Sequence, residues 1–381
     1  MSFRLLATVA AVLLAGAAGR ADVGKWDPAM AANGAVVDTK GVKWIDGKLL
    51  PLEGRAFDDT ASYYERLPAN VTERVNEGVR RFKTHTSGML FRFKTDSPFV
   101  IVRWKVTETA RHMRHMTDVG VSGWDVYRRE AKGGWRYVTS SHLASPTDVS
   151  GEFMKRVPWR GAAECLINLP LYNGVESISV GIDPQAKILP ARPHAGATKP
   201  VVFYGTSITQ GACASRPGLA FVNRVGRDLD VPVVGLGFSG SGVMEMEMCE
   251  HVAKIDASCY VLDCLWNMGT RARPDKRPGR NVEDNYEPFV RALRAKRPDV
   301  PIVMAEACDV YGGRAKEKDR LLKALYDKLV AEGWKQLVYL SKEKMYAPDG
   351  EGSMEGVHPN DLGMQTLAEA YGGAVRKALS R

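Results

Sequence analysis

The sequence lacks long apolar runs, metal-ligand patterns and repeats, and these absences exclude several classes of protein. After residue 21 no apolar segment approaches the roughly 20 residues that a membrane-spanning helix needs, so no later segment is expected to cross a bilayer. None of the cysteines has the close spacing of zinc ligands. There is no internal repeat, no low-complexity tract and no nucleic-acid-binding motif. What remains is typical of an ordinary globular protein.

The composition is sufficient for two domains with separate cores. The chain has 381 residues, of which 45% are hydrophobic and 25% charged. Residues 1–21 differ from the rest, because Arg4 precedes the apolar segment Leu5 to Ala18 and small residues follow up to Ala21. This layout predicts a signal peptide cleaved after Ala21 and a secreted or periplasmic protein. The remaining chain is still basic, which favours acidic polysaccharides or an anionic surface as partners.

The cysteines are even in number, and an oxidising compartment would allow one or two disulfides. They are Cys165, Cys213, Cys249, Cys259, Cys264 and Cys308. Cys213 and Cys249 both follow motif loops and are our first choice of pair. Cys259 and Cys264 lie in an apolar run, where a role as small buried hydrophobic side chains is expected.

Residues 22–188 show the period of two that is typical of antiparallel strands. Met89, Phe91 and Phe93 alternate with other residues, as do the apolar positions from Val100 to Val106. Gly133-Gly134 separates two further strands and predicts a hairpin turn. We expect an all-β domain, a sandwich, over residues 22–188. Residues 189–199 contain Pro, Ala and Gly without periodicity and are expected to form a linker.

Residues 200–381 show a βαβ succession. Five apolar runs predict buried strands at residues 201–204, 231–236, 260–265, 302–305 and 337–340. Helical patterns predict helices at residues 218–229, 243–254, 282–296, 316–332 and 361–379. This succession predicts an α/β domain with a parallel sheet covered on both faces. Functional sites of such sheets lie at the carboxyl ends of the strands.

The first of these strands runs directly into a serine. Four apolar residues, Val201 to Tyr204, are followed by Gly205, Thr206 and Ser207, so a sharp turn can place the serine at the start of a helix that begins near Arg216 or earlier. The unpaired N–H groups there can stabilise a negative oxygen. Two interpretations stay open on these residues alone: Ser207 is a nucleophile, or it only caps the helix.

Four segments at strand ends and in the last loop carry polar groups in a set order. They are Gly205-Thr206-Ser207, Gly237 to Gly242, Leu265 to Met268 and Glu355 to Pro359. This set resembles the four sequence blocks of the SGNH hydrolases, the GDSL-like esterases, over about residues 198 to 381. The resemblance implies that Ser207 attacks an ester, that His358 is its base and that Glu355 orients the histidine. It also implies an oxyanion hole made by the N–H groups of Ser207 and Gly240 and the side-chain amide of Asn267, with no cofactor and no metal.

Three positions depart from the pattern of that family. Glu355 stands where aspartate is usual, and Asp349 is a less favoured substitute for it. Leu265 and Met268 replace a glycine and an aspartate around Asn267, of which only the amide is needed for the hole.

The first half of the chain also resembles part of this family. Gly120 to Tyr127, with Gly123, Asp125 and Tyr127, is similar to the Gly-x-Asp-Leu-Tyr element of a β-sandwich that precedes SGNH domains in one bacterial esterase subgroup, with Val126 in place of leucine. Tyr64-Glu65-Arg66-Leu67-Pro68 fits the same subgroup. We expect these motifs to serve structure or domain packing rather than catalysis.

Several other features suggest rival sites. Gly235 to Gly240 matches a dinucleotide-binding fingerprint with Asp256 about 20 residues later, but the family resemblance explains the same glycines. His112 and His115 are expected in an exposed loop or in contact with substrate rather than on a metal. Two interpretations of Trp266 stay open: it forms a wall of the substrate pocket, or it packs in the core. Arg271 begins a basic run that also holds Arg273, Lys276, Arg277 and Arg280, and it is expected either to contact an acidic sugar or to lie in a solvated loop.

Taken together, the sequence predicts an exported two-domain serine esterase that removes short acyl groups, acetyl first, from a carbohydrate. The resemblance, and not the residues, supplies the carbohydrate. A general short-chain aryl or acyl esterase or lipase, an O-acetyltransferase on the same fold, and a non-catalytic carbohydrate-binding protein are the alternatives. The expected partner is a small-molecule or polysaccharide ester, and neither nucleic acid nor stable membrane insertion is expected.

Overall fold

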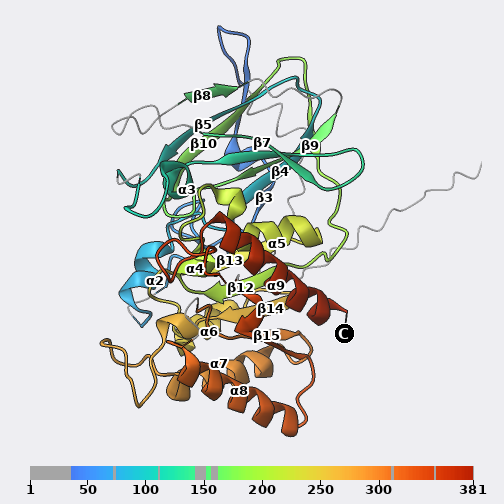
Figure 1. Cartoon of the computed structure of the whole chain (residues 1–381). Helices are drawn as coiled ribbons and strands as arrows, with labels where there is room; N and C mark the ends of the chain where they lie inside the picture. The colour runs from blue at the N-terminus through green and yellow to red at the C-terminus, as the bar shows by residue number, and fades with distance from the viewer. Residues whose placement is uncertain are drawn as a thin grey trace, which may run out of the picture.

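The computed structural model describes residues 36–71, 74–109, 112–141, 152–155, 162–309, 313–346 and 349–380. The expected signal peptide, residues 1–21, lies outside the described residues. Within the described ranges, no helix is both long enough and apolar enough to span a bilayer. Figure 1 shows the strands of the first half at the top of the molecule and the helix-covered sheet of the second half below them.

The first half contains two antiparallel sheets. One sheet has the strand order β1-β2-β10-β5-β8 and the other β11-β4-β9-β6-β7, with β3 paired to β4. The strands of the first sheet are β1 (Val36–Val37), β2 (Lys43–Asp46), β10 (Val175–Ile182), β5 (Val100–Val106) and β8 (Glu152–Lys155). Those of the second are β11 (Ile188–Pro190), β4 (Leu90–Thr95), β9 (Ala163–Asn168), β6 (Asp125–Arg129), β7 (Trp135–Ser140) and β3 (Leu52–Glu53). Along the chain, these strands alternate with the short helices η1 (Gly47–Leu49), α2 (Glu77–Phe82) and α3 (Asp118–Ser122).

The alternation seen in the sequence produces the core between these sheets. Phe91, Phe93, Val102 and Trp104 belong to one buried cluster, whereas Arg103 and Lys105 of β5 are exposed. The predicted hairpin is present: β6 pairs with β7 around Gly133 and Gly134, whose φ angles are 90° and 75°. Strand β4 differs from the expected half-buried pattern because both of its faces are covered. Leu189 and Pro190, expected in the linker, extend β11 at a sheet edge.

The second half contains a parallel five-stranded sheet, as predicted. Its order is β13-β12-β14-β15-β16. The strands are β12 (Val201–Gly205), β13 (Val233–Gly237), β14 (Cys259–Asp263), β15 (Ile302–Ala305) and β16 (Leu337–Leu340). The helices are α4 (Ser207–Gln210), η2 (Pro217–Leu219), α5 (Phe221–Leu229), α6 (Met246–Val252), η3 (Leu265–Asn267), α7 (Val282–Lys296), α8 (Lys316–Ala331), η4 (Lys342–Lys344) and α9 (Asp361–Leu379).

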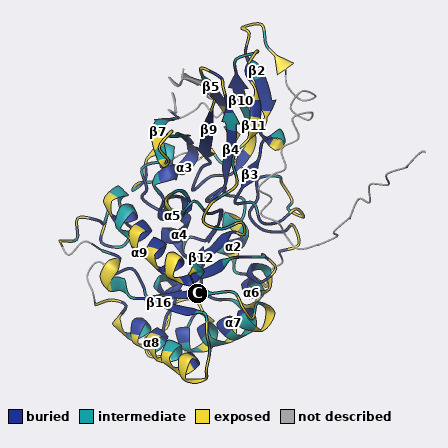
Figure 2. Ribbon diagram, turned by 90° about the vertical axis from the view of Figure 1, so that its right-hand side faces the viewer, coloured by how far each residue is buried: buried dark blue, intermediate teal, exposed yellow. Residues whose placement is uncertain are grey.

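Helices cover both faces of this sheet. Val201 and Phe203 of β12 belong to the cluster that contains α5 and α9 residues, and Val202 and Tyr204 belong to the one that contains α6, α7 and α8 residues. Figure 2 shows the strands as buried and the outer face of α8 as largely exposed. The fold class predicted from the sequence is therefore confirmed.

Arg66 joins the two halves. It is 1% exposed, and its guanidinium donates to the carbonyl oxygens of Gly235 (3.0 Å) and Gly237 (2.8 Å) on β13, and to Phe82 (2.5 Å). Burial lowers the pKa of Arg66 to about 9, so the side chain stays charged at neutral pH. Because β13 is an edge strand, these contacts satisfy carbonyl groups that have no neighbouring strand. The expected packing role of the Tyr64 to Pro68 motif is confirmed in this contact.

Asp125 of the second N-terminal motif makes a similar connection. Its carboxylate accepts hydrogen bonds from Asn168 within the β-domain and from Arg216 and the Gly218 N–H in the segment that follows α4. Asp125 is fully buried. The motif therefore holds the segment between α4 and α5 against the β-domain.

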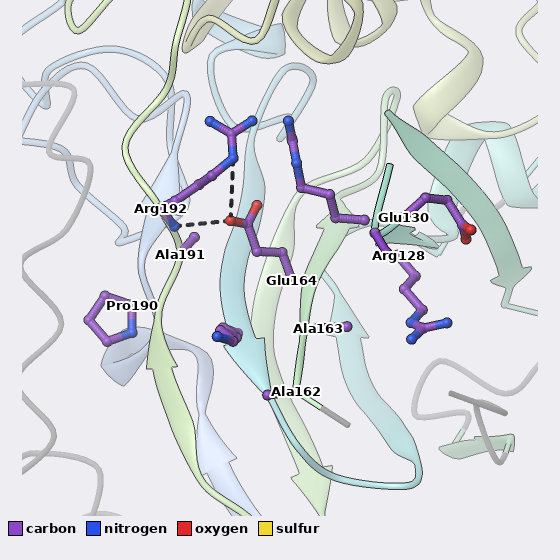
Figure 3. Close-up of a pocket in the computed structure, with 11 residues that line it drawn as sticks. Arg128, Glu130, Ala162, Ala163, Glu164, Pro190, Ala191 and Arg192 are labelled. Carbon is purple, nitrogen blue, oxygen red and sulfur yellow. Dashed lines mark hydrogen bonds and ion pairs between the residues drawn. The ribbon is translucent and has the colours of Figure 1, made fainter. Parts of the chain in front are cut away.

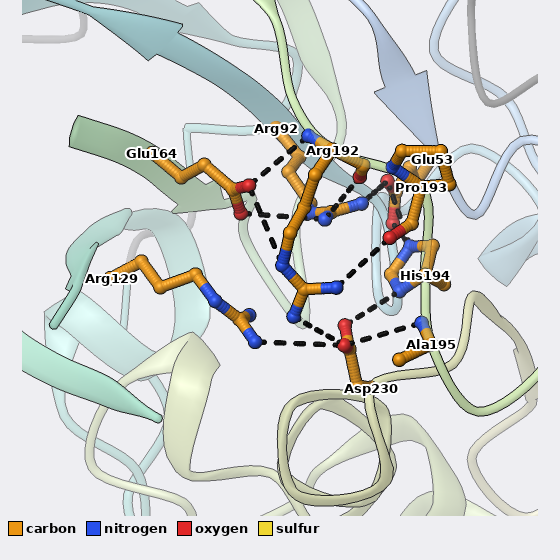
Figure 4. A network of polar contacts seen from close by, with 9 residues as sticks. All are labelled: Glu53, Arg92, Arg129, Glu164, Arg192, Pro193, His194, Ala195 and Asp230. Carbon is orange, nitrogen blue, oxygen red and sulfur yellow. Dashed lines mark hydrogen bonds and ion pairs between the residues drawn. The ribbon is translucent and has the colours of Figure 1, made fainter. Parts of the chain in front are cut away.

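A network of buried charges lies where the chain passes from one half to the other (Figure 4). Arg192 contacts Glu164 and Asp230, and His194 bonds Asp230 (3.2 Å) and Glu53 (3.0 Å). Burial raises the pKa of Glu53, but His194 and Arg92 outweigh it and hold that pKa below its ordinary value. Each buried charge thus has an opposite partner, as burial requires.

The first choice of disulfide was wrong. All six cysteines are buried free thiols. Cys213 packs in the cluster of α5 and α9, whereas Cys249 packs in the cluster of α6, α7 and α8 on the other face of the sheet. The sheet itself separates the two sulfur atoms.

The backbones of the two halves approach each other closely at Gly88 and Gly235. A Cβ atom at Gly88 would lie 2.8 Å from the Gly235 nitrogen, and one at Gly235 would lie 3.1 Å from the Ser87 oxygen. Gly88 also has a φ of +85°, which L side chains rarely adopt. Gly88 therefore needs glycine, and a side chain at Gly235 would fit only if the neighbouring backbone shifted by a few tenths of an ångström.

We predict that Gly88→Ala destabilises the protein by about 3 kcal/mol or more, because the added methyl group separates the two halves and also strains the backbone. Gly133→Ala is the matched control, since Gly133 has a φ of +90° but nothing within 4 Å of its Cβ position. The control is expected to lose only about 1 kcal/mol from backbone strain. Urea unfolding measures both, and equal losses would contradict the close contact.

Candidate active site

Ser207 lies at a turn that only small residues can form. Strand β12 ends at Gly205, Thr206 caps α4 by accepting from the Ile208 N–H, and α4 begins at Ser207 itself. A Cβ atom at Gly205 would lie 2.1 Å from Thr209 Oγ1 and 2.7 Å from the Asp263 carbonyl oxygen. The helix starts earlier than Arg216 and is only one turn long, because Gly211 ends it with a φ of 104°. Ser207 is 5% exposed at this turn.

Three side chains form a continuous hydrogen-bonded chain at this turn. Ser207 Oγ lies 2.8 Å from His358 Nε2, and His358 Nδ1 lies 2.8 Å from Glu355 Oε1. Since a carboxylate only accepts, Glu355 selects the Nδ1–H tautomer and leaves Nε2 as the acceptor for the serine proton. The structure thus brings together all three residues predicted for the triad, in the arrangement needed for a serine nucleophile.

The short loop around Glu355 fixes the carboxylate. Glu355 Oε1 also accepts from the His358 backbone N–H at 2.7 Å, and Ser353 Oγ accepts from the Gly356 N–H. Partial burial raises the pKa of Glu355, but the hydrogen bonds from His358 outweigh it, so the pKa lies below its ordinary value. The longer glutamate side chain therefore reaches the imidazole as an anion. Asp349 instead accepts from the Glu351 N–H.

The strand register aligns the ends of the three strands that precede the predicted oxyanion hole. Gly205 of β12 is paired with Gly237 of β13 on one side and with Asp263 of β14 on the other. Ser207, Gly240 and Asn267 follow these three paired residues by two to four positions. The N–H of Ser207, in the first turn of α4, has no intrahelical acceptor.

Asn267 presents an unused donor. It ends η3, is 9% exposed, and its Nδ2 has no hydrogen-bond partner among the described residues. A buried amide N–H₂ without a partner is costly in a folded protein, and such groups occur where a ligand is to be bound. This is what an oxyanion-hole donor requires before substrate arrives.

The residues expected to contact substrate, Trp266 and Arg271, contact other side chains of the protein. Arg271 binds Asp284, with Arg271 Nη2 2.6 Å from Asp284 Oδ1, and its side chain is 69% exposed. Arg277 and Arg280 both donate to the carbonyl oxygen of Gly240. Trp266 packs at the edge of the core, with Lys318 above its ring. Arg273, in contrast, lines a cavity of about 300 Å³ together with Lys316 and Lys318.

The β-domain adds residues to the site that spacing in the sequence did not identify. The Tyr172 hydroxyl donates to the Ser207 carbonyl oxygen (3.1 Å), and the ring of His115 stacks on that of His358 with centroids 5.7 Å apart. Both lie far from the motif blocks in the sequence, and only His115 had been marked, as a possible substrate contact. The β-domain is thus a direct neighbour of the catalytic histidine candidate.

The same histidines and Cys213 form a cluster in which the possible metal-ligating atoms lie within 4.8 Å of one another. Both ring nitrogens of His358 are already bonded, to Ser207 and to Glu355. A metal could therefore bind there only by replacing a contact of the predicted triad.

A second cavity lies in the β-domain (Figure 3). It measures about 520 Å³ and is lined by basic and acidic side chains that include Lys94, Arg128, Glu130, Glu164 and Arg192. It shares no residue with the Ser207 site. Arg192 and Glu164 both line this cavity and contact each other.

The dinucleotide-like glycines serve packing. A Cβ atom at Gly237 would lie 2.2 Å from the Gln210 nitrogen of α4, and Gly235 packs on Gly88. Asp256 binds Lys199 and Arg297 and precedes β14, at the amino end of the strands, whereas Gly237 lies at the carboxyl end of β13. The acidic residue that would hold a ribose is therefore at the wrong end of the strands for this fingerprint.

Asp263 contacts the turn that carries Ser207. It ends β14, is 3% exposed, and its Oδ2 accepts from Thr209 Oγ1 at 2.6 Å. Burial raises its pKa to about 6, against smaller opposing effects of the hydrogen bonds from Thr209 and Tyr371.

The chain matches two known protein families, one in each half. Residues 198–376 match the GDSL-like Lipase/Acylhydrolase family, and residues 42–188 match the GxDLY family, the N-terminus of SGNH-hydrolase-type esterases. No curated protein matches significantly.

Three solved structures resemble the chain. A protein described as a GDSL-like lipase from Bacteroides ovatus is 28% identical, with a TM-score of 0.78 over 89% of this chain and 98% of that one. A salicylyl-acyltransferase from a tetracycline biosynthetic pathway is 17% identical, with a TM-score of 0.70 over 89% and 98%. A family two carbohydrate esterase from Clostridium thermocellum, in complex with cellohexaose, is 13% identical, with a TM-score of 0.54 over 77% and 93%. The last two show likeness of fold alone.

Asp263→Asn is predicted to remove a pH-dependent loss of stability. Because the folded pKa is above the unfolded one, the folded state holds more protons between about pH 4 and 6, and the stability of the wild type falls as the pH rises through this range. Asparagine cannot ionise and keeps an acceptor for Thr209. In urea unfolding, the free energy of unfolding of the variant should equal that of the wild type at pH 4 and exceed it by roughly 1–3 kcal/mol at pH 8. A difference that does not change with pH would contradict the raised pKa.

Proposed function

The chain belongs to the GDSL-like lipase/acylhydrolase family, with a GxDLY-type N-terminal domain, and we propose that it is a serine esterase that removes short acyl groups, acetyl first, from a carbohydrate. Membership of this family supports an esterase or acyltransferase-like hydrolase of the SGNH type. The observation that carries the proposal is the chain of contacts from Ser207 through His358 to Glu355.

The geometry supports a two-step mechanism. His358 Nε2 takes the proton of Ser207 Oγ as the oxygen attacks the ester carbonyl carbon, and Glu355 stabilises the imidazolium that forms. The negative oxygen of the tetrahedral intermediate would accept from the N–H groups of Ser207 and Gly240 and from the Asn267 amide. His358 then gives its proton to the leaving alcohol, and water, activated by the same histidine, releases the acid from the acyl-serine.

Several observations support a carbohydrate substrate. A family two carbohydrate esterase that was solved with cellohexaose resembles 77% of this chain in fold. Basic side chains around Arg273 fit an acidic sugar near the third strand-end loop. As a second part of the proposal, residues 1–21 are a signal peptide, residues 22–188 the N-terminal β-sandwich domain, residues 189–199 a linker whose first two residues extend β11, and residues 200–381 the catalytic domain.

One alternative has a specific observation in its favour. The salicylyl-acyltransferase covers the chain as completely as the lipase-like relative does. An acyl-serine that is intercepted by a sugar hydroxyl rather than by water gives acyl transfer with the same residues. A general aryl or short-chain acyl esterase or lipase uses the same site without the carbohydrate.

Acetate release from 4-nitrophenyl acetate and from acetylated xylan should establish the reaction. Ser207→Ala should abolish turnover, Glu355→Gln should lower kcat by about 10²–10⁴, and Asn267→Ala should lower kcat by about 10²–10³ with little change in KM. Chelator should have no effect on any of them.

Substrate preference then separates the alternatives. A higher kcat/KM on acetylated xylan than on 4-nitrophenyl acetate supports the carbohydrate esterase, and the reverse supports a general esterase. Acetyl transfer to added xylooligosaccharide that outpaces hydrolysis would identify a transferase. Full activity of Ser207→Ala would refute the serine mechanism altogether.

A further inference from the structure

We propose that Gln210 is a positioning residue that, together with Arg277 and Arg280, holds the peptide carrying the Gly240 N–H in the orientation an oxyanion hole needs. This inference rests on the proposed function of that N–H. It assigns a role to one buried amide and to a basic segment that the sequence analysis connected with acidic substrates.

Gln210 bonds directly to the glycine-rich loop. Its Oε1 accepts from the Ser239 N–H at 2.9 Å, and its side chain is fully buried. Because the oxygen must accept there, the orientation of the amide group is settled, and Nε2 is the donor on the other side. That Nε2 faces His85 Nδ1 (3.1 Å) and the Leu171 carbonyl oxygen (3.2 Å).

The β-domain anchors Gln210 through His85. Since Gln210 Nε2 donates to Nδ1, His85 is the neutral tautomer with its proton on Nε2, which donates to Glu108 Oε1 at 2.9 Å. His85 is 2% exposed, and burial lowers its pKa, which keeps it neutral although Glu108 opposes this. Ser87 Oγ also donates to the Gln210 backbone carbonyl oxygen at 2.7 Å. A line of hydrogen bonds therefore runs from Glu108 to the Ser239 N–H.

Two guanidinium groups hold the other flank of the same peptide. Arg277 Nη1 and Arg280 Nη1 donate to the Gly240 carbonyl oxygen at 2.9 and 2.7 Å. Arg280 is only 8% exposed, and burial, with a smaller effect of Arg277, lowers its pKa. Charge-assisted bonds of this kind are stronger and more directional than neutral ones.

The consequence concerns the peptide between these two anchors. The Ser239 N–H belongs to the preceding peptide group and the Gly240 carbonyl to the following one, so both neighbours of the Ser239–Gly240 peptide are fixed. Gly240 has a φ of +64°, and Arg277 Nη1 lies 3.6 Å from its Cβ position. The N–H groups of Ser241 and Gly242 close the turn on the Phe238 carbonyl oxygen but do not bond the Ser239–Gly240 peptide itself, so without the two anchors this peptide is freer to rotate and turn its N–H away. An oxyanion donor must be oriented before the charge develops, because reorientation during the reaction raises the barrier.

The test compares Gln210→Met, Arg280→Met and Arg280→Lys with the wild type. Methionine matches glutamine in size but leaves the Ser239 N–H unpaired, whereas lysine at 280 can still donate to the Gly240 oxygen. Gln365→Met and Arg376→Met are matched controls, because both residues lie on α9 and make no described contact with Gly240. Hydrolysis of 4-nitrophenyl acetate, affinity for phenylboronic acid, and hydrogen exchange of residues 238–242 are measured for each.

If the inference is correct, Gln210→Met and Arg280→Met lower kcat about tenfold to a hundredfold with KM within about twofold, because only the transition state loses a donor. Boronate affinity should fall by a similar factor, and exchange of residues 238–242 should accelerate while that of α8 does not change. Arg280→Lys should recover a large part of kcat, and both controls should behave as wild type.

Unchanged exchange of residues 238–242 in both methionine variants would overturn the inference, as would a rise in KM with constant kcat. If a methionine variant is destabilised as a whole, hydrogen exchange accelerates in α8 as well as in residues 238–242. In that case the kcat and loop exchange of Arg280→Lys, which preserves the donor, decide the outcome. If the wild type cleaves no ester and binds no boronate, the proposed function fails, but the exchange data still decide whether Gln210 and Arg280 hold the loop.

Discussion

The open edge of β13 is the constraint on which the rest of the structure depends. A parallel sheet must end somewhere, and its last strand has carbonyl and N–H groups with no partner strand. Here the N-terminal half covers that edge with the guanidinium of Arg66 and with the backbone of Ser87 and Gly88. Because β13 also leads into the loop that carries Gly240, the contact that completes the sheet also locates one wall of the candidate active site. The two halves are therefore a single structural unit despite their separate cores.

The inner residues of the site are buried, whereas its outer residues are partly exposed to solvent. Ser207, Asn267 and Gln210 are buried, and Glu355 is the most exposed member of the predicted triad, with a side chain 44% exposed. A partly solvated carboxylate remains ionised without a large desolvation penalty, and its hydrogen bonds to His358 favour the anion further. The oxyanion donors gain from the opposite environment, because hydrogen bonds to a developing charge are worth more where water is excluded.

Local patterns in the sequence predicted much of this architecture. The bounds of α7 and α9 were predicted to the residue, because both helices have clear apolar periodicity. Helix α6 begins three residues later than predicted, since Val243 and Met244 are buried in the preceding loop, where Met244 has a φ of 61°. The resemblance of four sequence blocks to those of SGNH hydrolases, rather than any local periodicity, implied the triad of Ser207, His358 and Glu355 and the hole. Contacts such as that of Gln210 with His85, 125 residues apart, depend on how two domains meet, and no local pattern encodes that. The pairing of Cys213 with Cys249 was wrong for a different reason, because the two residues lie on opposite faces of the same parallel sheet.

The glycine pair at the junction has a further consequence for how such proteins can evolve. A β-sandwich from a distant relative could not be joined to this parallel sheet unless it brought a glycine at the position of Gly88 and a buried arginine at the position of Arg66. Exchange of whole domains, which is common among modular proteins, would expose the β13 edge and invite pairing with other chains. The two halves should therefore be inherited together, and new substrate ranges should arise by changes in loops such as the one that carries His115 rather than by recombination of domains.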